Sequence, residues 1–141
     1  MGTPLYTVAE LRAAEKTAQR ELPAGTLMAH ACAAVASRIA TLQFGKPLSI
    51  CVVAGPGNNG GDGYVAATEL QAARNRVTCI QLAEPVTGDA RDALARWRAS
   101  GGTTHKDWAA QENFDVIVDA VLGIGQTRPL QGALLAAVQW I

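Results

Sequence analysis

Apolar residues follow a strand-like pattern in some segments of the chain and a helical spacing in others, and the two kinds of segment alternate. Residues 48–54 form a nearly continuous apolar run with β-branched members, which predicts a strand buried on both faces of a sheet. Residues 77–82 and 116–121 predict two further strands, and residues 64–73 and 89–99 have helical spacing. Strands that alternate with helices are typical of parallel βαβ units. The pattern predicts an α/β fold, a Rossmann-like three-layer αβα sandwich with a mostly parallel sheet.

Two helices are expected before the first strand. Thr7 and Glu10 have the spacing of a capping box, which predicts a helix that begins at about Val8 and ends by Pro23. An apolar stripe over residues 27–42 predicts a second helix, which we expect to stop near residues 45–47. From Leu130 onward, another helical stripe begins.

Composition narrows the class of protein. The chain has 141 residues, of which 49% are hydrophobic, and this is enough for one compact domain with a core. Twelve basic residues balance twelve acidic ones, so neither a nucleic acid nor a membrane surface is an expected partner. No apolar stretch reaches the roughly 18 residues of a membrane span, and no targeting signal is recognisable, so we expect a cytoplasmic protein. Three widely spaced cysteines, Cys32, Cys51 and Cys79, are expected to be reduced core thiols.

A glycine-rich loop follows the first predicted strand. Five of the nine residues from Gly55 to Gly63 are glycine, which permits positive φ angles and lets backbone N–H groups approach an anion. The helix expected from Tyr64 would present further N–H groups, so the loop predicts a phosphate site. No Gly-Lys-Ser/Thr follows, which excludes the usual P-loop. The glycines at 55, 57 and 60 match the dinucleotide fingerprint, and Glu84 stands where a ribose-binding acid is expected.

A second loop, residues 119–129, follows the third predicted strand. The carboxyl ends of parallel strands meet at one edge of the sheet, where ligands bind in doubly wound folds. We therefore expect this loop and the glycine-rich loop to lie together.

Both loops resemble one known family. The string Gly-Pro-Gly-Asn-Asn-Gly-Gly-Asp-Gly at 55–63 is similar to the signature of the YjeF N-terminal domain, the family of NAD(P)H-hydrate epimerases. Residues 118–132, with Val-Asp-Ala, Gly-x-Gly and Arg-Pro, resemble its second motif. The resemblance implies an isomerase for cofactor repair that interconverts the R and S forms of hydrated NADH and NADPH, and a partner dehydratase that acts on the S form.

The resemblance also implies site residues. Asn59 and Asp119 would bind a potassium ion. The hydrated dinucleotide would contact the following residues: Asn58, Asn59, Gly60, Gly61, Asp62, Gly123, Ile124, Gly125, Gln126, Thr127, Arg128 and Pro129.

The reaction requires a proton donor and an acceptor, because hydroxide leaves C6 of the ring and water returns on the other face. Asp62 and Asp119 are the only acids in the two loops. We expect Asp119 to be the catalytic acid and base. Asp62 has two interpretations, a ligand of the ribose or the loop, and an N-cap of the helix that follows. Arg128 either pairs with a phosphate or covers the rim of the cleft.

The resemblance covers residues 1–141 as one domain, with departures. The family continues into a Val-Asp-x-Pro-Ser-Gly strand that this sequence lacks, so we expect a domain without its C-terminal strands. Such a sheet would expose an edge, which favours a homo-oligomer. Two alternative functions remain, a non-catalytic nucleotide-binding or scaffold module and, on the strength of Glu84, an NAD(P)-dependent oxidoreductase.

Overall fold

The computed structural model describes residues 4–23, 25–42, 45–108 and 113–141. It contains five helices and four strands within these ranges. Their order is α1 (Val8–Glu21), α2 (Thr26–Ala40), β1 (Ser49–Ala54), α3 (Asn58–Ala72), β2 (Arg76–Gln81), α4 (Gly88–Ala99), β3 (Thr104–His105), β4 (Val116–Ala120) and α5 (Gly132–Trp140).

The four strands form one sheet in the order β3-β2-β1-β4, and every pairing is parallel. Ile50 of β1 pairs with Val77 of β2 and with Val116 of β4. The strand order reverses direction between β1 and β4, because the chain moves outward to β3 before it returns to the other side of β1. Such a switch point is the usual ligand position in doubly wound folds.

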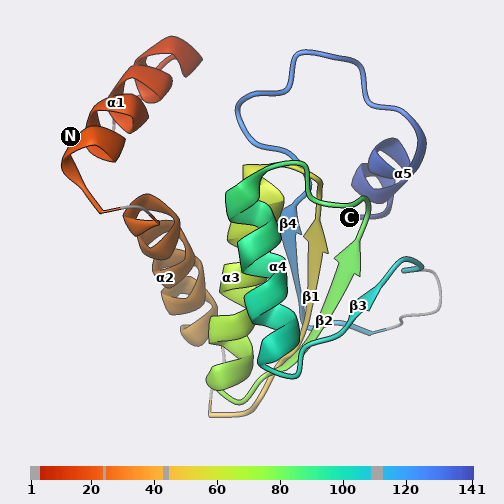
Figure 1. The fold of residues 1–141 in the computed structure, drawn as a ribbon. Coiled ribbons are helices and arrows are strands. Elements are labelled where there is room, and N and C mark those ends of the chain that lie inside the picture. The colour runs from red at the N-terminus through yellow and green to blue at the C-terminus, as the bar shows by residue number, and fades with distance from the viewer. Residues whose placement is uncertain (1–3, 24, 43–44, 109–112) are drawn as a thin grey trace.

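Helices cover both faces of the sheet, so the predicted three-layer αβα sandwich is confirmed (Figure 1). On one face α2, α3 and α4 pack on β1 and β2 around the buried side chains of Val52, Tyr64 and Trp97. On the other face α5 packs through Ala137 against Cys51 of β1 and the buried apolar residues around it. The residues of β1 from Ile50 to Ala54 are fully buried, as its continuous apolar run predicts.

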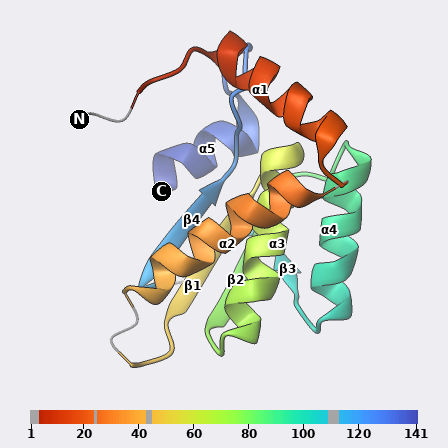
Figure 2. The same ribbon diagram turned by 90° about the vertical axis from the view of Figure 1, so that its left-hand side faces the viewer.

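The first helix stands apart from these layers. The capping box is present, since Thr7 Oγ1 accepts from the Glu10 backbone N–H at 3.3 Å and Glu10 Oε2 accepts from the Thr7 N–H at 2.7 Å. No residue of α1 is buried. Figure 2 shows α1 above α2, at the same end of the molecule as the loop that follows β4.

Several expected boundaries are wrong. The second helix ends at Ala40. The short strand β3 was not predicted, because two residues are too few to show a periodicity. The most consequential correction concerns α3, which begins at Asn58, six residues before the expected Tyr64.

The three cysteines are free thiols in buried positions, as expected. Burial raises the pKa of Cys32 and of Cys51 to about 11, which keeps both thiols protonated and poorly nucleophilic. None of the described helices has the length and apolar character that crossing a membrane requires.

Candidate functional site

Backbone hydrogen bonds bring the two loops together at the carboxyl edge of the sheet. The Gly55 N–H donates to the carbonyl oxygen of Ala120 at 3.0 Å. Asn59 Nδ2 donates to the carbonyl oxygen of Leu122 at 2.9 Å. The predicted proximity of the loops after β1 and β4 is therefore confirmed.

Glycines make this approach sterically feasible. A β-carbon on Gly55 would lie 1.9 Å from the carbonyl oxygen of Val121, and one on Gly60 would lie 1.9 Å from the carbonyl oxygen of Gly55. None of the five glycines from 55 to 63 has a positive φ angle, so the expected use of left-handed conformations is wrong. These glycines are needed because backbones of separate segments touch there.

The early start of α3 changes what the Asn-Asn-Gly-Gly-Asp string does. Gly57 occupies the N-cap position with extended backbone and no side-chain cap. Asn58, Asn59 and Gly60 form the first turn, where backbone N–H groups lack partners within the helix. These donors and the positive end of the helix dipole suit a phosphate group, so the anion-binding prediction keeps its physical basis.

Asp62 lies in the second turn of α3, so its interpretation as an N-cap is wrong. Its side chain is half-buried. Burial, followed by the negative charge of Glu15 on α1, raises the pKa of Asp62 to about 6. Its carbonyl oxygen accepts a hydrogen bond from Cys32 Sγ at 3.1 Å, which ties this turn to α2.

Asp119 stands near the end of β4, paired in register with Val53 of β1. The residue is exposed, and its Oδ1 accepts from the Val121 N–H at 3.0 Å. Its carboxylate is therefore anchored to the start of the second loop and open to solvent.

Residues 123–129 of the second loop are all exposed. Gln126 Nε2 donates to the carbonyl oxygen of Arg128, and the Gln126 N–H donates to the Gly123 carbonyl oxygen at 3.4 Å. Ile124 is 43% exposed. This loop thus presents backbone groups and the Arg128 side chain to solvent.

Two residues near the site could not be found from the sequence. A β-carbon on Gly125 would lie 3.5 Å from Arg12 Nη2, and Glu15 is the charge that acts on Asp62. Both belong to α1 and stand one helical turn apart. Helix α1 therefore borders the site next to both loops, although its sequence shows only an ordinary exposed helix.

Among the described residues, acidic, histidine and cysteine side chains offer few ligands for a metal ion. The described residues contain no cluster of three such groups. Asn59 and Asp119 instead offer an amide and a carboxylate, and both anchor on residues 121–122 through their hydrogen bonds. Hard oxygen donors of this kind suit hard cations.

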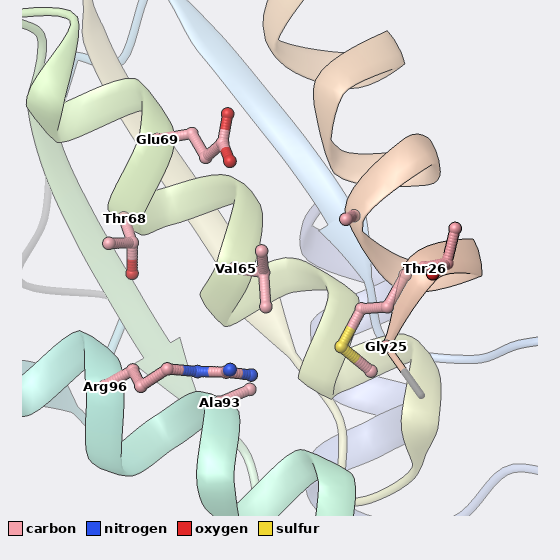
Figure 3. A pocket seen from close by; sticks show the side chains of 9 residues that line it. Gly25, Thr26, Val65, Thr68, Glu69, Ala93 and Arg96 are labelled. Atoms are coloured by element: carbon pink, nitrogen blue, oxygen red, sulfur yellow. The ribbon is translucent and has the colours of Figure 1, made fainter. Parts of the chain in front are cut away.

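A cavity of about 420 Å³ lies away from these loops, among α2, α3 and α4. Figure 3 shows Glu69 and Val65 of α3 and Arg96 of α4 along it. No residue of the two loops lines it, so we do not assign the chemistry to this cavity.

Comparisons with known proteins show which proteins this chain is similar to. Residues 24–141 match the family described as YjeF-related protein N-terminus. The NAD(P)H-hydrate epimerase of Bordetella pertussis strain Tohama I is 41% identical over 128 residues, which cover 89% of this chain and 54% of that protein. The bifunctional NAD(P)H-hydrate repair enzyme Nnr of Mycobacterium tuberculosis strain H37Rv is 35% identical over 142 residues, which cover 95% of this chain and 29% of that protein.

The fold also matches a solved structure. The crystal structure of yeast ynu0 superposes with a TM-score of 0.87 at 21% identity, over 97% of this chain and 64% of that chain. This likeness concerns the fold alone. The chain spans about half the length of the epimerases that it resembles.

Proposed function

Because this chain belongs to the YjeF-related N-terminal family, we propose that it is an NAD(P)H-hydrate epimerase that interconverts the R and S forms of hydrated NADH and NADPH. The observation that carries the proposal is the hydrogen bond from Asn59 to the Leu122 carbonyl. This bond joins the first turn of α3, which suits a phosphate group, to the loop that follows Asp119.

The proposed roles follow from position. The N–H groups of Asn58, Asn59 and Gly60 bind the diphosphate at the start of α3. Residues 123–129 contact the hydrated ring and its ribose, and Arg128 pairs with a phosphate oxygen. Gly61 leaves little room for a β-carbon, which would lie 3.0 Å from the Ala90 Cα, so it serves the close packing of α3 on α4.

Asp119 is the proposed acid and base. In the forward step its carboxyl gives a proton to the C6 hydroxyl, the C–O bond breaks, water leaves, and the ring nitrogen lone pair stabilises the cation. Water then adds to the opposite face of C6, and the proton that it loses returns to the Asp119 carboxylate, which restores the starting state. Asp62, with a pKa raised to about 6, exchanges protons near neutral pH and is the second carboxyl available for this step.

A potassium ion would be held by the amide oxygen of Asn59 and the carboxylate of Asp119. This donor set fits. Asn59 donates through Nδ2 to Leu122, which leaves its amide oxygen for a cation, and Asp119 accepts from Val121 through Oδ1, which leaves its second carboxylate oxygen. When bound, the ion supplies positive charge that orients Asp119 and the phosphates of the substrate. Replacement of potassium by tetramethylammonium should then lower the rate.

A dehydratase is the proposed functional partner. Two relatives are named bifunctional NAD(P)H-hydrate repair enzymes, which supports coupling between epimerisation and a second repair step. An epimerase of this kind makes all of the hydrated cofactor accessible to an enzyme that accepts one epimer.

We also propose that the chain forms a homo-oligomer. In the described sheet β4 pairs only with β1, and Ile117 on this edge strand is 36% exposed. Unpaired strand edges favour association with another chain. A dimer in sedimentation velocity is the expected result, and a monodisperse monomer at all concentrations would refute this proposal.

The activity is tested with the R form of hydrated NADPH and an excess of S-specific dehydratase. With this chain present, NADPH should be recovered from the whole sample well before spontaneous epimerisation allows it. Recovery at the same rate with and without the chain would contradict the proposed function.

A further inference from the structure

A second cavity, of about 270 Å³, opens where β2 and β3 end. Residues from the end of β2, the segment after β3 and the first turn of α5 line it, and they include Gln81, Ala83, Glu84, Lys106, Trp108 and Ala133. Whole small-molecule ligands usually occupy about 300–1,000 Å³. The cavity therefore suits one part of a dinucleotide.

This cavity lies directly beside the glycine-rich loop. The Leu82 N–H donates to the Ala54 carbonyl oxygen at 3.1 Å, and the Val86 N–H donates to the Pro56 carbonyl oxygen at 2.9 Å. Strand β2 stands on one side of β1, and β4 stands on the other, with about 10 Å between these two strands. A dinucleotide with its diphosphate at the start of α3 can thus place one nucleoside toward β4 and the other toward β2.

The walls of the cavity are fixed by contacts within the protein. Trp108 is half-buried, and its ring centroid lies 6.4 Å from that of Trp140. Gln81 is 4% exposed, accepts from Arg98 Nη2 at 3.2 Å and donates to the Ala83 carbonyl oxygen at 3.4 Å. An aromatic ring held in place is a stacking surface for a nucleobase.

The cavity carries two opposite charges, Glu84 and Lys106, and both residues are exposed. The net charge of this pair is zero, so the cavity suits a neutral nucleoside better than a second diphosphate. A carboxylate at the end of β2 can accept hydrogen bonds from ribose hydroxyls, and it repels a phosphate at the same position. An ammonium group attracts that phosphate.

We propose that this cavity binds the adenosine half of the hydrated dinucleotide. Glu84 favours a 2′-hydroxyl on the adenosine ribose, and Lys106 favours a 2′-phosphate at the same position. The inference rests on the proposed function for the identity of the whole substrate. It assigns Glu84 a role in recognition of the ribose, without any transfer of hydride.

Binding of ADP-ribose and 2′-phospho-ADP-ribose, measured by isothermal titration calorimetry, tests this site. These probes carry the adenosine half and lack the nicotinamide ring, so their binding does not depend on catalysis. Glu84→Gln should raise the affinity for 2′-phospho-ADP-ribose relative to ADP-ribose by about two- to fivefold, as expected for exposed charges. Lys106→Gln should lower the same ratio by a similar factor.

Two matched variants serve as controls. Asp92→Asn removes a carboxylate from the exposed side of α4, and Lys46→Gln removes an ammonium group before β1, at the opposite edge of the sheet. Neither should change the ratio. An unchanged ratio in both cavity variants, or no binding of ADP-ribose at millimolar concentration, would overturn the inference.

The same experiment separates this inference from the proposed function. If the chain binds both probes with the expected ratios and does not accelerate epimerisation, the epimerase proposal fails and the adenosine site stands. If the chain accelerates epimerisation and the ratios do not change, the adenosine site fails alone.

Discussion

Asn59 Nδ2 donates to the carbonyl oxygen of Leu122 at 2.9 Å and so connects the first turn of α3 to the loop after β4 across 63 positions of sequence. The bond lies at the switch point of the sheet, between the strands β1 and β4. This hydrogen bond gives Asn59 a structural role in addition to any contact with a cation.

We predict that Asn59→Ala loosens the second loop and slows catalysis. Loss of the hydrogen bond should lower the free energy of unfolding by about 0.5–1.5 kcal/mol. The rate should fall roughly tenfold or more, because a misplaced loop removes substrate positioning. Hydrogen exchange of residues 122–131 and the coupled NADPH assay measure the two effects. Gln139→Ala, exposed on α5, is the control, and full activity with unchanged exchange in Asn59→Ala would contradict the prediction.

Asp119→Asn should remove the acceleration of epimerisation while the fold is kept. Asparagine retains an oxygen that can accept from the Val121 N–H, and the position is exposed, so the free energy of unfolding should change little. Loss of a positioned acid and base typically lowers the rate by about 10²–10⁴-fold. The coupled assay measures the rate, and circular dichroism checks the fold. Turnover equal to that of the unmodified chain would show that Asp119 is not the acid and base.

Two glycine substitutions should differ sharply in stability. Gly55→Ala places a β-carbon 1.9 Å from the Val121 carbonyl oxygen, whereas Gly57→Ala meets no atom within 4 Å. Since backbone must move in the first variant, we expect a loss of about 1–3 kcal/mol in the free energy of unfolding. The second should cost less than about 1 kcal/mol, because alanine meets no atom there and is only a poorer N-cap residue than glycine. Urea unfolding measures both, and equal midpoints for the two variants would refute the close approach.

The raised pKa of Asp62 predicts a pH dependence of stability. Its pKa is about 6 in the folded chain and 3.8 for an unperturbed aspartic acid, so the folded state favours the protonated form. The stability from this group is fully present below about pH 4 and decreases as the pH rises through about 6. Asp62→Asn cannot ionise, and it should therefore gain stability relative to the unmodified chain as the pH rises from about 4 to about 7.

Urea unfolding at several pH values tests this expectation. Asp92→Asn, on the exposed side of α4, should show no such trend. A stability difference for Asp62→Asn that stays constant across this pH range would mean that burial and Glu15 do not act on Asp62.

The class of fold, and the edge of the sheet at which the two loops meet, can be predicted from the order of residues along the chain. The apolar run at 50–54 and the alternation of strands and helices depend on neighbours along the chain, so their periodicities reveal them directly. Parallel strands then require that the loops after β1 and β4 share one edge, which is why Asp119 and the glycine-rich string were predicted to lie together.

The start of α3, the steric role of its glycines and the burial of Asp62 could not be predicted in this way, because they depend on packing between distant segments. Glycine and asparagine have low helix propensity, so residues 58–63 resemble a loop until close packing on Gly55 and Ala120 stabilises them as helix. Arg12 and Glu15 reach the site because α1 lies beside it. Steric approach and burial depend on atoms far apart in the chain, and no local spacing encodes them.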